Sequence, residues 1–132
     1  MTFEVVELIG TVVARYHQEY EREAGAHALT GAQARVLSLL TLEPLPMRQI
    51  AVRLKCEPSN VTGIIDRLET RGLVERRPDP QDRRVKLAAV TDEGRRTARK
   101  LRDGLSFARE PLAELSHDER VVLRDLLVRM LG

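Results

Sequence analysis

The sequence predicts a mostly α-helical fold with a small β-hairpin wing. Apolar residues recur at helical spacing along most of the 132 residues, and the period becomes extended only between Leu73 and Val90. Just before that stretch, a tight turn joins two short amphipathic segments. Helix, turn, helix and hairpin in this order predict a winged helix-turn-helix, and the apolar helices at both ends predict N- and C-terminal dimerisation helices.

The N-terminal segment, residues 3–24, has the pattern of a long amphipathic helix that Gly25 ends. Its apolar positions lie three or four residues apart, at Val5, Ile9, Val12, Tyr16 and Tyr20. The stripe is wide enough to pack against more than one partner. Because a small domain rarely supplies that much cover within itself, we expect part of this helix to lie in an interface.

A second helix is predicted to begin at Thr30, because Gln33 follows at the spacing of a capping box. Its apolar residues predict a core-facing helix, which Pro44 and Pro46 stop. The next segment has apolar residues at Met47, Ile50, Ala51 and Leu54, and the one after it at Val61, Ile64, Ile65 and Leu68. Pro58 suits the first turn of that last helix, and Gly72 suits the left-handed residue that closes it.

The polar face of the helix from Pro58 onward predicts a DNA recognition helix. It carries Ser, Asn, Thr and Gly, each of which weakens a helix by some tenths to about 1 kcal/mol relative to the residues that usually fill a solvated face. Short polar side chains let a helix approach the floor of the major groove. We therefore expect DNA contacts from Ser59, Asn60, Thr62 and Arg67. A generic helical hairpin is the alternative.

The extended runs around the turn-rich sequence PDPQD predict a hairpin. Arg83 and Arg84 lie near its tip beside Asp82, and Arg76 and Arg77 lie on the opposite strand. Four arginines on so short a hairpin repel one another, and an anionic partner would remove that cost. We therefore expect a wing that inserts an arginine into the minor groove, with Arg76 also binding DNA. A solvated loop is the alternative.

Two further helices are predicted after Thr91. The first has a heptad-like seam at Ala98, Leu101, Leu105, Ala108 and Leu112, which Pro111 kinks or ends. Ser116 and Glu119 form a second capping box, which opens a last helix with an apolar side. Both ends thus carry more apolar surface than one winged core can cover, so we expect a homodimer. The predicted division is a helical dimerisation region, residues 1–29 and 92–132, and a DNA-binding lobe, residues 30–91.

Charge is distributed unevenly, although the net charge is only +2. Residues 46–100 hold 14 Lys and Arg against 8 Asp and Glu, whereas the rest of the chain is net acidic. A basic middle segment is typical of a DNA-binding lobe. Trp is absent and Phe and Tyr number two each, so single-strand binding by base stacking is not expected.

Composition narrows the remaining function classes. No apolar run approaches the roughly 20 residues of a membrane span, and the N-terminus lacks the layout of a signal peptide, so we expect a cytoplasmic protein that binds no membrane. A single cysteine excludes an internal disulfide framework. The sequence contains no nucleophile with a nearby base, no phosphate loop and no metal-ligand spacing, so we expect no catalytic residues, metal or cofactor.

Two motifs resemble the multiple antibiotic resistance regulator (MarR) family. They are SNVTGIIDRLETRGLVERR, from Ser59 to Arg77, and DRRVKLAAVTDEG, from Asp82 to Gly94. The resemblance implies that Asp82 orients Arg84 into the minor groove and that Arg83 contacts phosphate. It also implies a homodimer built from the terminal helices, an inverted-repeat operator in double-stranded DNA, and repression relieved by a small ligand or by oxidation.

Some positions depart from the family pattern. Redox-sensing members carry a reactive cysteine near the first helix, whereas Cys56 lies in the helix-turn-helix, where we expect a small buried apolar residue. By analogy, the polar groups nearest the family's ligand cleft are Arg15, Tyr16 and His17, although Tyr16 suits dimer core equally well. The leading hypothesis is a dimeric, sequence-specific DNA-binding transcriptional repressor. The alternative is a winged-helix protein-interaction module without DNA binding.

Overall fold

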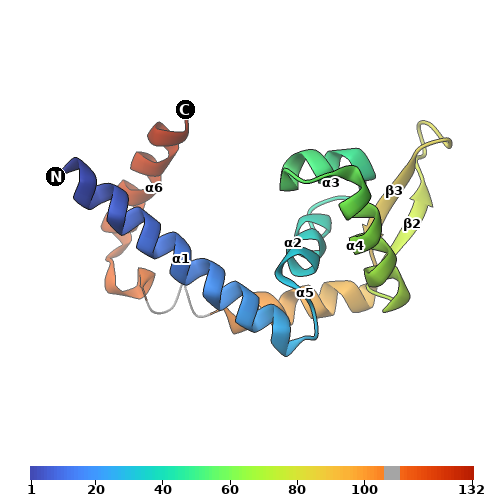
Figure 1. Cartoon of the computed structure of the whole chain (residues 1–132), viewed down its shortest axis with the longest axis horizontal. Coiled ribbons are helices and arrows are strands. Elements are labelled where there is room, and N and C mark those ends of the chain that lie inside the picture. Colours follow the sequence, from blue (N-terminus) through green and yellow to red (C-terminus); the bar gives the residue numbers. More distant parts are fainter. Residues whose placement is uncertain (106–110) are drawn as a thin grey trace. The chain divides into compact units, whose positions relative to one another are not determined.

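The computed structural model describes residues 1–105 and 111–132, and these are mostly helical, as predicted (Figure 1). Ala108 of the predicted seam lies outside the described residues. The elements are, in order, α1 (Thr2–Ala26), α2 (Gly31–Leu40), β1 (Leu45–Pro46), α3 (Met47–Leu54), α4 (Pro58–Thr70), β2 (Val74–Pro78), β3 (Lys86–Val90), α5 (Asp92–Gly104), the 3-10 helix η1 (Leu112–Glu114) and α6 (His117–Leu131).

The described residues form two compact units, which we describe separately. One comprises Met1–Glu19 and Leu105–Gly132, and the other is Tyr20–Gly104. The second unit is wider than the expected lobe of residues 30–91, because Tyr20 and Ala24 of α1 are buried in it and α5 packs against α2. The assignment of dimerisation and DNA binding to separate parts of the chain stays a prediction.

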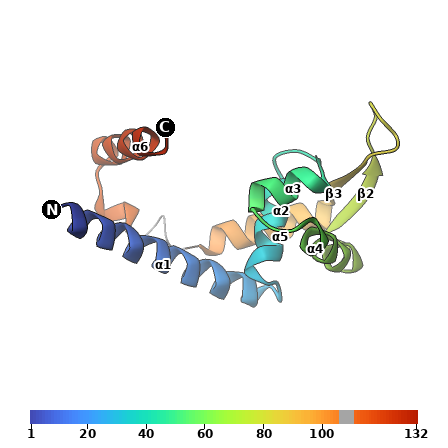
Figure 2. The same ribbon diagram turned by 45° about the horizontal axis from the view of Figure 1, so that its top comes forward.

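The core of the second unit is made by helices that surround α2. Its largest fully buried side chains include Leu37 and Leu40 of α2, Ile50 of α3, and Ile65 and Leu68 of α4. α4 contacts α2, α3 and β2, so the apolar side of this predicted recognition helix packs against the rest of the unit. Figure 2 shows the β2–β3 hairpin extending beyond these helices.

The sheet has three antiparallel strands in the order β1-β3-β2, one strand more than the predicted hairpin. β2 pairs with β3 from Val74 opposite Val90 to Pro78 opposite Lys86, and β1 pairs with the other edge of β3. A two-residue strand has no measurable alternation, so Pro44 and Pro46 were interpreted only as helix stops. Pro46 is tolerated there because β1 is an edge strand.

Most helix boundaries agree with the predicted signals. Thr30 and Ser116 both form complete capping boxes, with Gln33 and Glu119 respectively. Pro58 occupies the first turn of α4, and Gly72 follows that helix with φ of 73°. The seam predicted to continue past Gly104 is wrong at Leu105 and Leu112, because α5 ends at Gly104 and Leu112 lies in η1.

The Thr30 box provides a direct test of the fold. The Thr30 hydroxyl accepts a hydrogen bond from Gln33 N at 3.1 Å, so Thr30→Ala is expected to lower the free energy of unfolding by about 1 kcal/mol. Urea titrations followed by far-ultraviolet circular dichroism at one fixed protein concentration measure the change. Gln49→Ala on the exposed side of α3 is the control, with an expected change within about 0.5 kcal/mol. Equal losses in both variants would contradict the capping role.

The first unit exposes most of its apolar side chains. On α1 these include Val5, Ile9, Val12 and Tyr16, and on α6 they include Leu123, Leu126, Leu127 and Met130. The surplus apolar surface predicted at both ends is therefore present, and its burial against a second copy stays a prediction. No helix among residues 1–105 and 111–132 combines the length and apolar character needed to cross a membrane.

Candidate nucleic-acid interface

The recognition helix α4 separates an apolar side from a polar one, as predicted. Val61, Ile65 and Leu68 are fully buried against the rest of the unit. The four residues expected to contact DNA are all exposed, and they are Ser59, Asn60, Thr62 and Arg67. The helix thus presents short polar groups near its start and a guanidinium two turns later. Contact between these groups and DNA stays a prediction.

A pocket of about 440 Å³ lies between the polar face of α4 and the start of α2. Ser59, Asn60 and Arg67 line it, together with Gln33 and Arg35 of α2. Cys56 also lines the pocket and is only partly buried, so it is less buried than we expected from the sequence. The sequence carried no signal for this hollow, because its α2 residues lie far from α4 along the chain.

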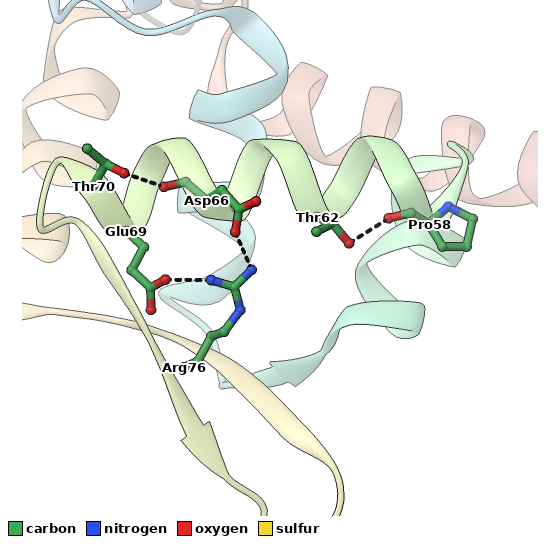
Figure 3. A network of polar contacts seen from close by, with 6 residues as sticks. All are labelled: Pro58, Thr62, Asp66, Glu69, Thr70 and Arg76. Carbon is green, nitrogen blue, oxygen red and sulfur yellow. Dashed lines mark hydrogen bonds and ion pairs between the residues drawn. The ribbon is translucent and has the colours of Figure 1, made fainter.

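Two threonines of α4 have the same local geometry at opposite ends of the helix (Figure 3). The Thr62 hydroxyl donates to the carbonyl oxygen of Pro58 at 3.2 Å, and the Thr70 hydroxyl donates to that of Asp66 at 2.9 Å. Each hydroxyl oxygen keeps acceptor capacity, and both residues are exposed. Thr62 can therefore accept a hydrogen bond from a base edge without losing its bond within the helix.

The tip of the wing holds one arginine in a defined orientation. Asp82 Oδ1 accepts hydrogen bonds from the backbone N–H of Arg84 at 3.2 Å and from its Nε at 3.1 Å. These bonds, the side-chain bond first, hold the pKa of the Asp82 carboxyl below its usual range, so the carboxylate stays ionised at neutral pH. The Arg84 side chain is nevertheless 91% exposed. Asp82 thus holds the Arg84 guanidinium without covering it. Entry of this guanidinium into the minor groove stays a prediction.

The expectation that the hairpin arginines repel one another is wrong for three of the four. Arg76 pairs with Asp66 and Glu69, Arg77 pairs with Glu75, and Arg84 pairs with Asp82. Two of the compensating carboxylates, Glu75 and Asp82, lie on the hairpin itself, and the other two belong to α4. Within the part of the chain that the structure describes, Arg83 is exposed and forms no ion pair.

Arg76 lies between the wing and the recognition helix. One terminal nitrogen donates to Glu69 Oε1 at 2.5 Å and the other to Asp66 Oδ1 at 2.6 Å (Figure 3). The hydrogen bond to Asp66, and then the charge of Glu69, raise the pKa of Arg76 above its usual range although partial burial opposes them. The guanidinium is therefore always charged, and it is directed at α4. The sequence predicts a DNA contact for Arg76 and no role for either carboxylate. The sequence signal for this contact is a pair of acidic residues three apart on a helix, followed by an arginine on the next strand.

The residues proposed from the sequence to bind a ligand are consecutive on α1. Arg15, Tyr16 and His17 are exposed, and the Tyr16 and His17 rings meet edge to face with centroids 6.2 Å apart. All three belong to the first unit, and none lines the pocket beside α4. Ligand binding by these residues stays a prediction.

Comparisons with known proteins agree with this architecture. A family model described as the MarR family matches residues 29–86. The uncharacterized HTH-type transcriptional regulator YdgJ of Bacillus subtilis (strain 168) is 34% identical over an alignment of 108 residues, gaps included, that covers 78% of this chain and 66% of YdgJ. The chain thus spans slightly less than two thirds of that relative.

Two solved structures share the fold across nearly the whole chain. CouR from Rhodococcus jostii RHA1, crystallised with p-coumaroyl-CoA, has a TM-score of 0.81 at 28% identity, over 93% of this chain and 88% of CouR. Apo MarR from E. coli has a TM-score of 0.79 at 25% identity, over 96% of each chain. Together with the helix-turn-helix and the three-stranded sheet, these matches show that residues 29–86 form a winged helix-turn-helix of the MarR family.

Proposed function

We propose that the protein is a dimeric, sequence-specific DNA-binding repressor whose operator is an inverted repeat. The main support for the proposal is that one unit exposes both the short polar side chains of α4 and the guanidinium of Arg84, which Asp82 holds in place. A helix bearing Ser59, Asn60 and Thr62 suits the major groove, and an exposed arginine at a hairpin tip suits the narrow minor groove beside it.

Dimerisation follows from the exposed apolar side chains of α1 and α6. Exposed apolar surface on this scale is unfavourable in water, and a second copy of the same helices would bury it in an isologous interface. A two-fold dimer presents two recognition helices, so its site has two-fold symmetry as well. Repression then follows from occupation of the operator.

Relief of repression by a small molecule is the remaining part of the proposal. CouR has p-coumaroyl-CoA bound in its crystal structure. In the present protein, a ligand in the pocket beside α4 would cover Ser59, Asn60 and Arg67, and would therefore compete with DNA for the same side chains. Arg15, Tyr16 and His17 on α1 are the second candidate place, proposed from the sequence.

Light scattering and DNA binding test the first part together. The chain has a mass of 15.0 kDa, so scattering at micromolar concentration should give about twice that value. Sequencing of co-purified genomic fragments should yield an inverted repeat with half-sites centred about 10 bp apart. A monomer that binds one chain per site would overturn the dimer. Failure to prefer any duplex over random DNA would instead favour a protein-interaction module.

A further inference from the structure

We propose that Arg76 is the positioning residue that sets the wing at a fixed angle to the recognition helix, with Asp66 and Glu69 as its anchors on α4. The inference rests on the proposed DNA binding and assigns Arg76 a role different from the DNA contact expected from the sequence. It explains how the major-groove contact of α4 and the minor-groove contact of Arg84 are held at a fixed position relative to each other. None of the three residues needs to touch DNA for it to hold.

The strand side of this contact follows from alternation along β2. Val74 and Arg76 are two residues apart, so they share one face of the strand, whereas Glu75 and Arg77 share the other. Val74 is buried in the core. Arg76 is therefore the next residue on the core-facing side, at the point where the hairpin leaves the core, and its side chain is only 27% exposed. Arg77 pairs with Glu75 on its own strand and contacts no residue of α4 among the hydrogen bonds of the described residues.

The helix side supplies two acceptors rather than one. Asp66 and Glu69 are three residues apart, so both lie on one side of α4. The two terminal nitrogens of Arg76 bond them separately, at 2.6 Å and 2.5 Å. A planar guanidinium held by carboxylates on successive turns resists rotation as well as separation, whereas a lysine ammonium offers a point charge without that fork.

Two consequences for DNA binding follow from this geometry. First, Arg76 lies in the middle of β2, whereas Arg84 lies near the tip of the hairpin. Because a strand rises about 3.3 Å per residue, a small rotation at Arg76 becomes a larger displacement of the Arg84 guanidinium at the tip. Second, Asp66 is one turn from Thr62 on the outward side of α4, and without Arg76 both carboxylates would repel phosphates. Arg76 thus keeps the wing contact aligned and offsets one of the two negative charges on this side of α4.

The test compares Arg76→Ala, Arg76→Lys and the double variant Asp66→Ala with Glu69→Ala. Binding is measured by fluorescence anisotropy over a salt series, on operator duplexes with A·T-rich or G·C-rich flanks and on random duplex. We expect Arg76→Ala to lose the preference for A·T-rich flanks, with a loss on the A·T-flanked operator of about tenfold, the size of one lost groove contact. The salt slope should stay unchanged, because a guanidinium already paired with carboxylates releases no DNA counterions.

The double variant separates positioning from charge. It removes two negative charges and frees Arg76, yet we expect it to lose the same flank preference, because the anchors are gone. Arg76→Lys keeps the positive charge without the planar guanidinium, so we expect it to keep only part of the preference for A·T-rich flanks. Arg77→Ala is the matched control, since it removes an arginine from the same strand without touching α4, and the flank preference should persist.

Three outcomes would overturn the inference. One is an Arg76→Ala protein that binds both operators more weakly by the same factor, with a salt slope smaller by about two per dimer, as for a direct phosphate contact. Another is a double variant that keeps its flank preference. The third is a wild-type protein with specific binding but no flank preference, because there would be no wing contact to align. Should Arg76→Ala fail to fold by circular dichroism, the double variant decides, since alanine is compatible with the exposed helix positions. Absence of specific binding in the wild type would instead overturn the proposed function.

Discussion

Replacing Thr62 by alanine is expected to weaken binding to the operator by about 1 to 3 kcal/mol while binding to random duplex stays nearly unchanged. The same is expected for Ser59→Ala and Asn60→Ala. The three side chains are exposed near the start of α4, and short polar groups at this position reach base edges. Because base contacts carry sequence information and phosphate contacts carry little, the ratio of specific to random affinity is the quantity to measure.

Thr70→Ala is the control for this prediction. Thr70 has the same side chain, the same exposure and the same hydrogen bond to a carbonyl four residues earlier, but it lies at the other end of α4. Any change in helix stability caused by removing the threonine should therefore appear in both variants. Operator binding should fall only for Thr62→Ala. Equal losses on operator and random duplex in all three variants near the start of α4 would show that this end of the helix positions the protein without reading sequence.

Arg84→Ala is expected to reduce operator affinity by about 1 to 3 kcal/mol, most strongly where the flanks are A·T-rich, because narrow minor grooves attract arginine. Its melting temperature should barely change, since the side chain is 91% exposed and surface substitutions usually stay within about 0.5 kcal/mol. Asp82→Ala should have a similar but smaller effect, since it removes the acceptor that aims Arg84. Anisotropy titrations measure the loss of DNA affinity, and thermal unfolding at one protein concentration measures the change in stability.

Arg83→Ala tests the expected phosphate contact of the residue next to Arg84. A phosphate contact by Arg83 would be lost on all duplexes alike, and the salt slope would fall by about two in a dimer. Arg96→Ala on α5 is the control, because Arg96, like Arg84, is exposed and paired with one carboxylate, which is Glu93 at 2.6 Å. Its affinity and salt slope should match the wild type. Unaltered affinity and slope in both Arg83→Ala and Arg84→Ala would remove the wing from the interface.

Local signals determined much of the fold. The capping boxes at Thr30 and Ser116, the proline that opens α4 and the glycine that follows it depend on contacts within a few residues, so the sequence shows them directly. The apolar spacing of α4 predicted its buried side, and the same spacing placed Ser59, Asn60 and Thr62 on the exposed side. The aspartate two residues before Arg84 likewise makes a local contact, and it is present.

Contacts between distant segments were decided only by the tertiary structure. The strand β1 exists because the edge of β3 is available to Leu45 and Pro46, and two residues carry no period that could predict it. The pocket beside α4 arises where α2 and α4 meet. Arg76 was counted with the other hairpin arginines because its carboxylate partners belong to another element. Periodicity shows which face of an element is buried, whereas the choice of partner across elements depends on how those faces are brought together in space.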